Sequence, residues 1–363
     1  MNEKLLKGLI FISGIVCLYA FIAVRSLPLF NLVMKEKMVP YYWDKTKYGE
    51  FYYFNFIKYF KEEGLPPARE KFQFSSKQAS LNEAKIITFG DSYFDFSRHK
   101  QIPERLADTL NVKVYFYHGD FPLSVFAKDN FKNKEPKILL YERVERYIPY
   151  AFEKENTPDF SVDTRSKLRK AIAGIKNKIF YDRTEELLDA LLKRSIFTTG
   201  IYSFVATLKF DLFKYISPLT PVYTLDKGRP WLFYYDQTNS EYTSFYYHHS
   251  ENEMNNICNN MADLADKLKK EYNIRLIYLP LPAKYTLYHN VVNNDKYNNF
   301  LPRLYQGLEK RGVEFIDAYD DLRNSDDTLY YGTDSHWNEE GIQITLDKIL
   351  EYFKNDSTLS KYF

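Results

Sequence analysis

Two short segments of the chain carry side chains that together could perform nucleophilic catalysis. The first is an apolar run that ends at Ser92, and the second holds Asp334 and His336 two positions apart. A serine hydroxyl is a weak nucleophile at neutral pH until a neighbouring imidazole accepts its proton. That imidazole in turn needs a carboxylate to fix its orientation and tautomer. We therefore predict a catalytic triad of Ser92, His336 and Asp334.

The residues before Ser92 predict how its hydroxyl is presented. Residues 85–89 have the apolar pattern of a buried strand, and Gly90 and Asp91 then lead into the serine. A nucleophile on a sharp strand-to-helix turn needs a preceding residue that tolerates unusual backbone angles, which glycine does. The backbone N–H of Ser92 is then an expected oxyanion donor.

Short apolar runs separated by helical patterns predict the sheet that positions these residues. Five strands are expected, at residues 86–89, 112–117, 138–141, 274–279 and 313–316. We predict an α/β fold with a doubly wound, five-stranded, mainly parallel sheet, which places the ligand site outside the carboxyl ends of the strands. Apolar residues at helical spacing predict amphipathic helices over residues 254–268 and 342–353.

The pattern also predicts how the chain is divided. The expected parts are a membrane anchor at residues 1–25, a stalk or cap at 26–80, the α/β domain at 81–148 and 248–363, and a helical and aromatic insertion at 149–247. Within the insertion, a helix is expected over residues 165–193. The aromatic stretch at 196–216 fits either a membrane surface or ordinary burial against the sheet.

Gly8 to Val24 form an uncharged apolar run near the minimum length of a membrane-spanning helix. Lys4 and Lys7 precede it, so the positive-inside tendency places the rest of the chain outside the cytoplasm, in the periplasm or at the cell surface. A cleaved signal peptide is the alternative, but no Ala-x-Ala site follows the run. The interpretation is a single-pass anchor.

Composition excludes several other classes of protein. The chain has 50 basic and 48 acidic residues, so there is no electrostatic argument for nucleic acid binding. Its two cysteines, Cys17 and Cys258, indicate neither a disulfide framework nor a zinc site, and no metal or cofactor is predicted. Aromatic residues make up 18% of the chain, which suits sugar surfaces and core packing equally well.

Both motifs resemble those of a known family. Gly90-Asp91-Ser92 is similar to the nucleophile block of the SGNH (GDSL) hydrolase superfamily, and residues 334–337, Asp-Ser-His-Trp, resemble the Asp-x-His-Trp block of its extracytoplasmic alginate O-acetyltransferase-like branch. Residues 139–146 and 230–234 also resemble stretches of that branch, and the likeness covers residues 81–147 and 230–353. The serine precedes the Asp-x-His block here, as in ordinary SGNH enzymes and unlike in that branch.

The resemblance implies further site residues. Gly119 matches the glycine oxyanion donor, whereas no asparagine donor follows the third strand, where Arg146 or Arg143 could supply positive charge instead. A structural ion pair is an equally good interpretation of the charged residues at 142–146. The substrate-binding candidates are Asp91, Trp337 and Trp231, and packing of the loop is the alternative for Trp337.

The function implied is that of an O-acyltransferase, with acetyl as the expected group, which carries the acyl group on Ser92 and passes it to a hydroxyl of a cell-surface or exported polysaccharide. The resemblance also implies a membrane-bound O-acyltransferase as partner and acyl donor. A carbohydrate acetyl esterase would use the same triad and is one alternative. A noncatalytic glycan-binding subunit of an export or acetylation complex is another.

Overall fold

The computed structural model describes residues 3–23, 57–60, 79–95, 99–119, 122–133, 135–152, 199–213, 222–226, 229–234, 237, 245–292 and 296–362. By its internal contacts the chain forms two compact units. One comprises residues 1–61 and 160–216, and the other comprises residues 62–159 and 217–363. Both segments with predicted catalytic residues belong to the second unit.

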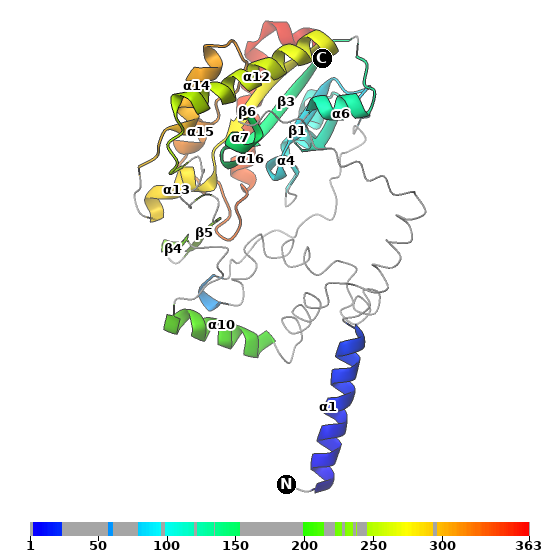
Figure 1. Cartoon of the computed structure of the whole chain (residues 1–363), viewed down its shortest axis with the longest axis vertical. Coiled ribbons are helices and arrows are strands. Elements are labelled where there is room, and N and C mark those ends of the chain that lie inside the picture. Colours follow the sequence, from blue (N-terminus) through cyan, green and yellow to red (C-terminus); the bar gives the residue numbers. More distant parts are fainter. Residues whose placement is uncertain are drawn as a thin grey trace. The chain divides into compact units, whose positions relative to one another are not determined.

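A parallel sheet of four strands forms the centre of the second unit (Figure 1). The strand order is β2-β1-β3-β6, and every neighbouring pair is parallel. The strands are β1 (Ile86–Gly90), β2 (Val114–His118), β3 (Lys137–Val144) and β6 (Ile274–Leu281). Every residue of β1 and β3 is buried, as expected for central strands covered on both faces. The predicted α/β class and the first four predicted strands are confirmed.

Alternate residues of these strands enter two separate hydrophobic clusters, one on each face of the sheet. Ile87 and Phe89 of β1 join one cluster, whereas Ile86 joins the other. Their side chains point to opposite faces because a strand has a period of two residues. The first face is covered by α6 (Pro122–Lys128), α12 (Glu251–Tyr272) and α14 (Phe300–Glu309), and the second by α5 (Ile102–Leu110) and α16 (Glu339–Asn355).

Local sequence signals define the ends of the longest of these helices. The Ser250 side chain accepts a hydrogen bond from the backbone N–H of Glu253, whose carboxylate returns to Ser250 in a capping box at the start of α12. Asn273 ends α12 in the left-handed conformation, with φ of 54°. Asn338 caps α16 by accepting from two backbone N–H groups. Both predicted amphipathic helices are thereby confirmed as α12 and α16.

The expected fifth strand at residues 313–316 was wrong in extent. Only Phe315 forms a parallel bridge, with Tyr278 of β6, supported by two backbone hydrogen bonds of 2.8 and 2.9 Å. Asp317 follows directly, and its carboxylate accepts a hydrogen bond of 2.9 Å from the N–H of Tyr319. The chain therefore turns into α15 (Tyr319–Arg323) after a single bridge.

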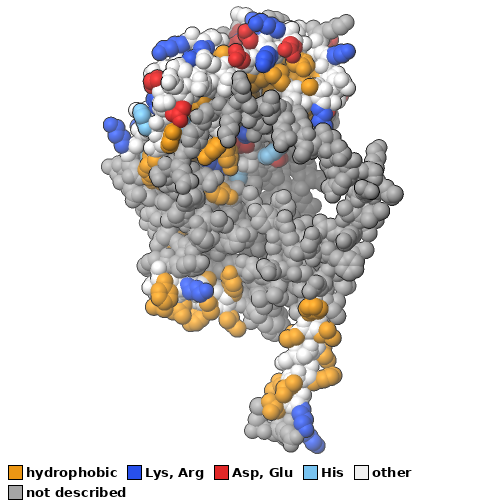
Figure 2. Space-filling model, viewed as in Figure 1, with side chains coloured by type: hydrophobic (Ala, Val, Ile, Leu, Met, Phe, Trp, Pro, Cys, Tyr) orange, Lys and Arg blue, Asp and Glu red, His pale blue; other side chains and the backbone are white. Residues whose placement is uncertain are grey.

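The predicted insertion contains elements of two kinds. The helix expected over residues 165–193 lies outside the described residues. A helix is present in the aromatic stretch, as α10 (Thr199–Phe213), and β4 (Val222–Asp226) pairs antiparallel with β5 (Arg229–Phe233) in a two-stranded sheet that the sequence did not predict. Phe210 of α10 is buried edge-on against Phe60, whereas seven other large side chains of α10 are exposed and form an apolar group in Figure 2.

The run expected to anchor the chain forms a helix, α1 (Glu3–Ala23), with exposed apolar side chains (Figures 1 and 2). Its first two turns also contain Glu3, Lys4 and Lys7. Among the helices in the described ranges, none has the length and apolar character needed to cross a membrane. The structure thus does not support the membrane-spanning segment expected from Gly8 to Val24.

Short helices complete the second unit, and three of them begin at the carboxyl ends of strands. The helix α4 (Ser92–Asp95) follows β1, and α13 (Lys284–Val292) follows β6. The 3₁₀ helix η3 (Glu145–Tyr147) follows β3 and leads into α7 (Ile148–Phe152). The terminal 3₁₀ helix is η4 (Ser357–Tyr362). The first unit has one further short 3₁₀ helix, η2 (Lys58–Phe60). The end of the sheet where α4, η3 and α13 begin is therefore where site residues are expected.

Candidate active site

Ser92 is the first residue of α4 and follows β1 after a single intervening residue, Asp91. The Asp91 carboxylate accepts a hydrogen bond of 2.9 Å from the N–H of Tyr93 and so fixes the start of this turn. A side chain at Gly90 would meet the Glu142 carboxylate at 2.5 Å, so glycine is needed there for the close approach. Ser92 itself is partly buried. The predicted strand-turn-helix context of the serine is present.

Asp334 and His336 form a buried pair in the loop before α16. The His336 Nδ1–H donates to Asp334 Oδ1 at 2.6 Å, and the backbone N–H of His336 donates to the same oxygen at 3.0 Å. Both side chains are almost completely buried. A carboxylate held in this way fixes the ring so that Nε2 is the nitrogen available for proton transfer.

Tyr93 joins the turn of Ser92 to the loop of His336. Its hydroxyl donates to the backbone oxygen of Ser335 at 2.7 Å. Its ring lies 5.4 Å from the His336 ring and 5.3 Å from the Trp337 ring, measured between centroids. The residue next to the predicted nucleophile thus packs directly on the predicted base. Two segments more than half the chain apart in sequence are thus brought into contact through Tyr93.

The two further oxyanion candidates differ in their surroundings. Gly119 has φ of 149°, and its N–H donates to the backbone oxygen of Gly90 at 3.0 Å, so this N–H is already engaged. Arg146, in η3, is buried and its guanidinium lies over the rings of Tyr147 and Tyr234, at 4.7 and 5.7 Å from their centroids. Arg146 therefore brings positive charge to the carboxyl end of β3.

Buried charges gather below the turn of Ser92. The Glu142 carboxylate accepts from the N–H of Asp91 at 2.9 Å, and Arg143 approaches the Asp91 carboxylate at 3.7 Å. Burial, and then the charge of Asp91, raises the pKa of Glu142 well above its ordinary value. Residues 142–146 were expected to form either an ion pair or part of the oxyanion site, and an ion pair is present between Arg143 and Asp91. The Asp91 carboxylate also accepts a hydrogen bond of 3.3 Å from the N–H of Val144.

The substrate-binding candidates are all buried. Asp91 is occupied by the contacts described above. Trp337 is 2% exposed and its indole N–H donates to the side-chain oxygen of Gln101 at 3.3 Å. Trp231, on β5, is 6% exposed, and its ring centroid lies 4.4 Å from that of Tyr288. These contacts are those of packing residues, and a role in substrate binding stays a prediction for each.

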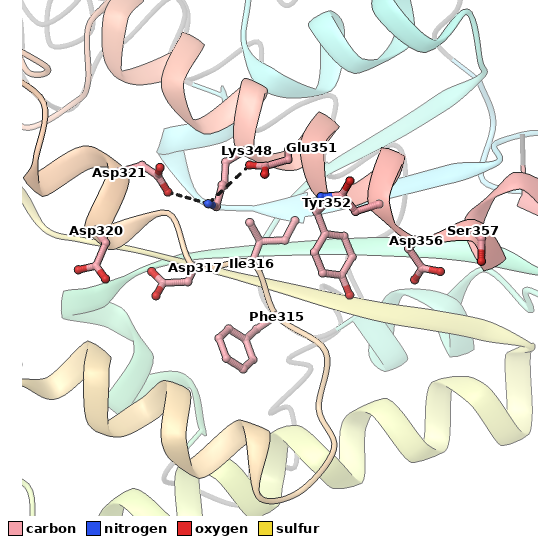
Figure 3. A pocket seen from close by; sticks show the side chains of 11 residues that line it. Phe315, Ile316, Asp317, Asp320, Asp321, Lys348, Glu351, Tyr352, Asp356 and Ser357 are labelled. Atoms are coloured by element: carbon pink, nitrogen blue, oxygen red, sulfur yellow. Dashed lines mark ion pairs between the residues drawn. The ribbon is translucent and has the colours of Figure 1, made fainter.

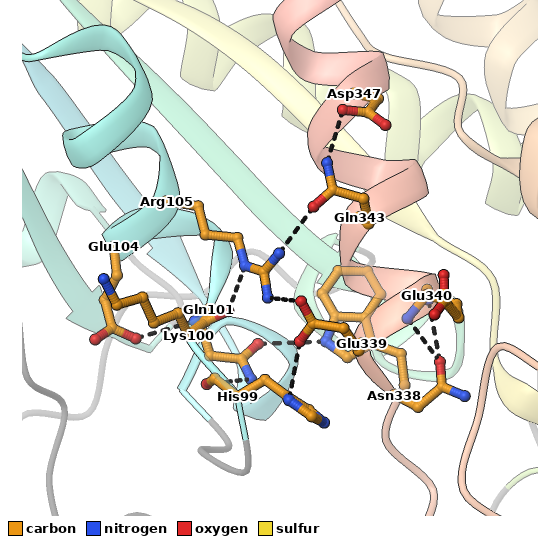
Figure 4. A network of polar contacts seen from close by, with 12 residues as sticks. His99, Lys100, Gln101, Glu104, Arg105, Asn338, Glu339, Glu340, Gln343 and Asp347 are labelled. Carbon is orange, nitrogen blue, oxygen red and sulfur yellow. Dashed lines mark hydrogen bonds and ion pairs between the residues drawn. The ribbon is translucent and has the colours of Figure 1, made fainter.

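A polar network holds the far end of the His336 loop to α5 (Figure 4). Glu339, the first residue of α16, pairs with His99 at 2.9 Å and with Arg105 of α5. The other ring nitrogen of His99 lies 2.6 Å from the hydroxyl of Tyr331, which belongs to the same loop. Sequence reasoning missed this network, because its residues are common surface types without a motif.

A pocket of about 610 Å³ lies beside α15 and α16, away from this site (Figure 3). Its wall is acidic, and Lys348 pairs there with Asp321 at 2.9 Å and approaches Glu351 at 3.7 Å. None of the predicted site residues lines it. In the ranges described above, no three His, Cys, Asp or Glu side chains are grouped so that they could hold a metal ion.

Comparison with known families identifies one similar domain. Residues 227–361 match a family model described as the SGNH hydrolase-like domain of the acetyltransferase AlgX. The C-terminal part of the chain resembles an AlgX-type SGNH domain. The match contains Trp231, Asp334 and His336, whereas Ser92 lies outside it. A comparison with curated proteins gives no match. The resemblance to the SGNH superfamily, and within it to AlgX, is therefore confirmed.

Proposed function

We propose that this AlgX-like chain is an O-acyltransferase that carries an acyl group, acetyl in the first instance, on Ser92. The observation that supports this most directly is the buried Asp334–His336 pair packed against Tyr93, the neighbour of Ser92. A base oriented by a carboxylate beside a serine on a strand-to-helix turn is the arrangement that acyl transfer needs. The match to an acetyltransferase domain supports the same class.

The proposed reaction has two steps. In the first step, His336 Nε2 takes the proton of the Ser92 hydroxyl while the Ser92 oxygen attacks the carbonyl carbon of the acyl donor. The leaving oxygen of the donor then receives that proton from His336. In the second, His336 takes the proton of a sugar hydroxyl, whose oxygen attacks the acyl carbon. The bond between the acyl carbon and the Ser92 oxygen then breaks, and that oxygen receives the proton from His336. The backbone N–H of Ser92 and the charge of Arg146 are the proposed stabilisers of the oxyanion.

We further propose that the domain acts outside the cytoplasm, on a cell-surface or exported polysaccharide, and receives its acyl group from a membrane-bound O-acyltransferase. These features rest on the resemblance to an AlgX-type domain. Reactivity of an introduced cysteine with a membrane-impermeant maleimide, in intact cells, tests the location. Labelling only after lysis would contradict it.

The decisive experiment is intact-mass measurement of the full-length protein after brief exposure to 4-nitrophenyl acetate, beside Ser92→Ala. An acetyl adduct on the parent protein alone is expected. Discharge of that adduct by an added oligosaccharide rather than by water separates the transferase from the esterase. An equal adduct on Ser92→Ala would exclude Ser92 as the nucleophile.

A noncatalytic glycan-binding subunit is the second candidate, and the engaged N–H of Gly119 favours it, because this expected oxyanion donor is already used within the fold. Glycan binding that is identical in the parent and in Ser92→Ala, with no adduct in either, would support this alternative. The mass experiment and a binding titration on the same two proteins therefore separate the candidates.

A further inference from the structure

We propose that Lys284 is a positioning residue of the active site, whose ammonium group holds the loop that carries Asp334 and His336. This inference rests on the proposed function. Lys284 is the first residue of α13, directly after the carboxyl end of β6, and it is completely buried. No motif in the sequence marks it.

The Lys284 ammonium is surrounded by four backbone carbonyl oxygens. Its Nζ lies 2.6 Å from the oxygen of Tyr331, 2.8 Å from those of Leu232 and Gly332, and 2.9 Å from that of Asp334. Three of these belong to the loop before His336 and one to β5. An ammonium group has three N–H donors, so all of them are used and at least one is shared.

Two aromatic rings of β5 complete the surroundings of this charge. The Nζ lies 5.5 Å from the ring centroid of Trp231 and 5.2 Å from that of Phe233, within the range of a cation–π interaction. A further hydrogen bond of 2.9 Å, from the N–H of Leu232 to the oxygen of Gly332, joins β5 to the loop. The Trp-Leu-Phe segment of the sequence therefore acts through Lys284 on the catalytic loop.

Four converging carbonyl oxygens repel one another unless a cation lies between them, because each carries a partial negative charge. One of these oxygens belongs to Asp334 itself, and the side chain of that residue orients His336. Loss of the ammonium is thus expected to displace Asp334 relative to His336. A misplacement of about 1 Å in a catalytic group costs on the order of 100-fold in rate.

Lys137 offers a matched control at the other end of the sheet. It is 2% exposed, it begins β3, and its Nζ donates to the backbone oxygens of Asn82 at 2.8 Å and of Ala84 at 2.5 Å. It therefore resembles Lys284 in burial and in the type of acceptor, but it holds a loop at the amino ends of the strands. A purely structural role predicts the same outcome for both lysines.

The test compares Lys284→Met with Lys137→Met in the full-length protein. Both are expected to lower the melting temperature. At a temperature where both are folded, Lys284→Met is expected to lower the maximal rate of acetylation by 4-nitrophenyl acetate about 100-fold with little change in KM, whereas Lys137→Met stays within about threefold of the parent. Equal rates in Lys284→Met and the parent, or equal losses in both variants, would overturn the proposal.

Two further measurements keep the test independent of folding defects and of the reaction itself. In Lys284→Ala, added propylammonium is expected to restore acetylation, and propanol is not, since only the cation can gather the carbonyls. The downfield proton resonance of His336 Nδ1–H is expected in the parent and in Lys137→Met and is expected to be lost in Lys284→Met. Its persistence there would refute positioning even if Ser92 proved not to be the nucleophile.

Discussion

Two histidine–aspartate pairs of the second unit differ mainly in burial. The His336–Asp334 pair is 2.6 Å long with side chains 1% and 0% exposed, whereas the His118–Asp95 pair, at the ends of β2 and α4, is 3.0 Å long with side chains 54% and 43% exposed. Water competes for the exposed pair and not for the buried one. The same two residue types therefore give a fixed imidazole shielded from water in one place and an ordinary surface ion pair in the other.

Replacement of the buried carboxylate should have the largest effect. Asp334→Asn keeps the size of the side chain but changes the hydrogen bond to His336, and in serine triads such a change lowers turnover about 10,000-fold. We expect a loss of this order in the rate of acyl-serine formation, measured by intact mass against time. The control is Asp95→Asn, which should acylate within about threefold of the parent. Similar losses in the two variants would show that burial does not distinguish the pairs.

Glu142 is a buried carboxyl group that, unlike Asp334, has no histidine as its partner among the contacts described, and burial raises its pKa. Above pH 4.5, Glu142 keeps its proton in the folded protein but loses it in the unfolded chain. Because the folded state binds the extra proton, the free energy of unfolding falls as pH rises above that value. Glu142→Gln removes this dependence. We expect the stability of the variant to rise relative to that of the parent as pH increases from 5 to 8, measured by urea unfolding. Parallel curves for the two proteins would contradict the raised pKa.

His249 shows what burial does to a histidine when it outweighs a nearby carboxylate. Its side chain is buried next to Phe300, and burial lowers its pKa to about 4 despite the charge of Glu253. The unfolded chain takes up a proton below pH 6.5, so stability falls as pH drops from there toward 4. In His249→Phe we expect this loss to shrink by about 2 kcal/mol. An unchanged acid limb in urea unfolding would count against this assignment.

The smallest effect is expected at the exposed pair. The hydrogen bond to Asp95 raises the pKa of His118, so the pair adds stability below the ordinary value of 6.5 that is lost as pH rises through the raised pKa. Asp95→Asn should lower the pKa of His118 in an NMR titration. At these exposures the change in stability should stay below about 1 kcal/mol at any pH. A larger change would mean that the exposed pair is coupled to the site.

The parts of the site that have a local signal could be predicted from the sequence. The turn of Ser92 and the Asp334–His336 pair were predicted because each depends on residues within a few positions of one another. The contacts of Lys284 could not be predicted in this way. Their acceptors are backbone oxygens on two other segments, and any residue type supplies such an oxygen. The position of Lys284 just after a strand was the available signal, since side chains at the carboxyl ends of parallel strands line sites.

The fold shows the same division between local and distant information. The apolar patterns of β1, β3 and β6 predicted strands correctly, because a buried parallel strand is apolar on both faces, and the edge strand β2 was predicted from its aromatic and β-branched residues. The run at residues 313–316 is also mostly apolar, yet it forms a single bridge before the chain turns at Asp317. How far a strand extends is decided by its neighbours in space, which composition does not reveal.

The order of pairing in the sheet has a consequence for how the chain folds as it is synthesised. β3 is complete once Val144 has been made, but its partner β6 begins only at Ile274. Through the intervening synthesis β3 keeps an unpaired edge, which other chains can join. A fragment that ends before Ile274 would contain Ser92 and only β1, β2 and β3 of the central sheet, and we expect it to aggregate. The part of the chain that carries the proposed nucleophile thus depends on the later part for its solubility.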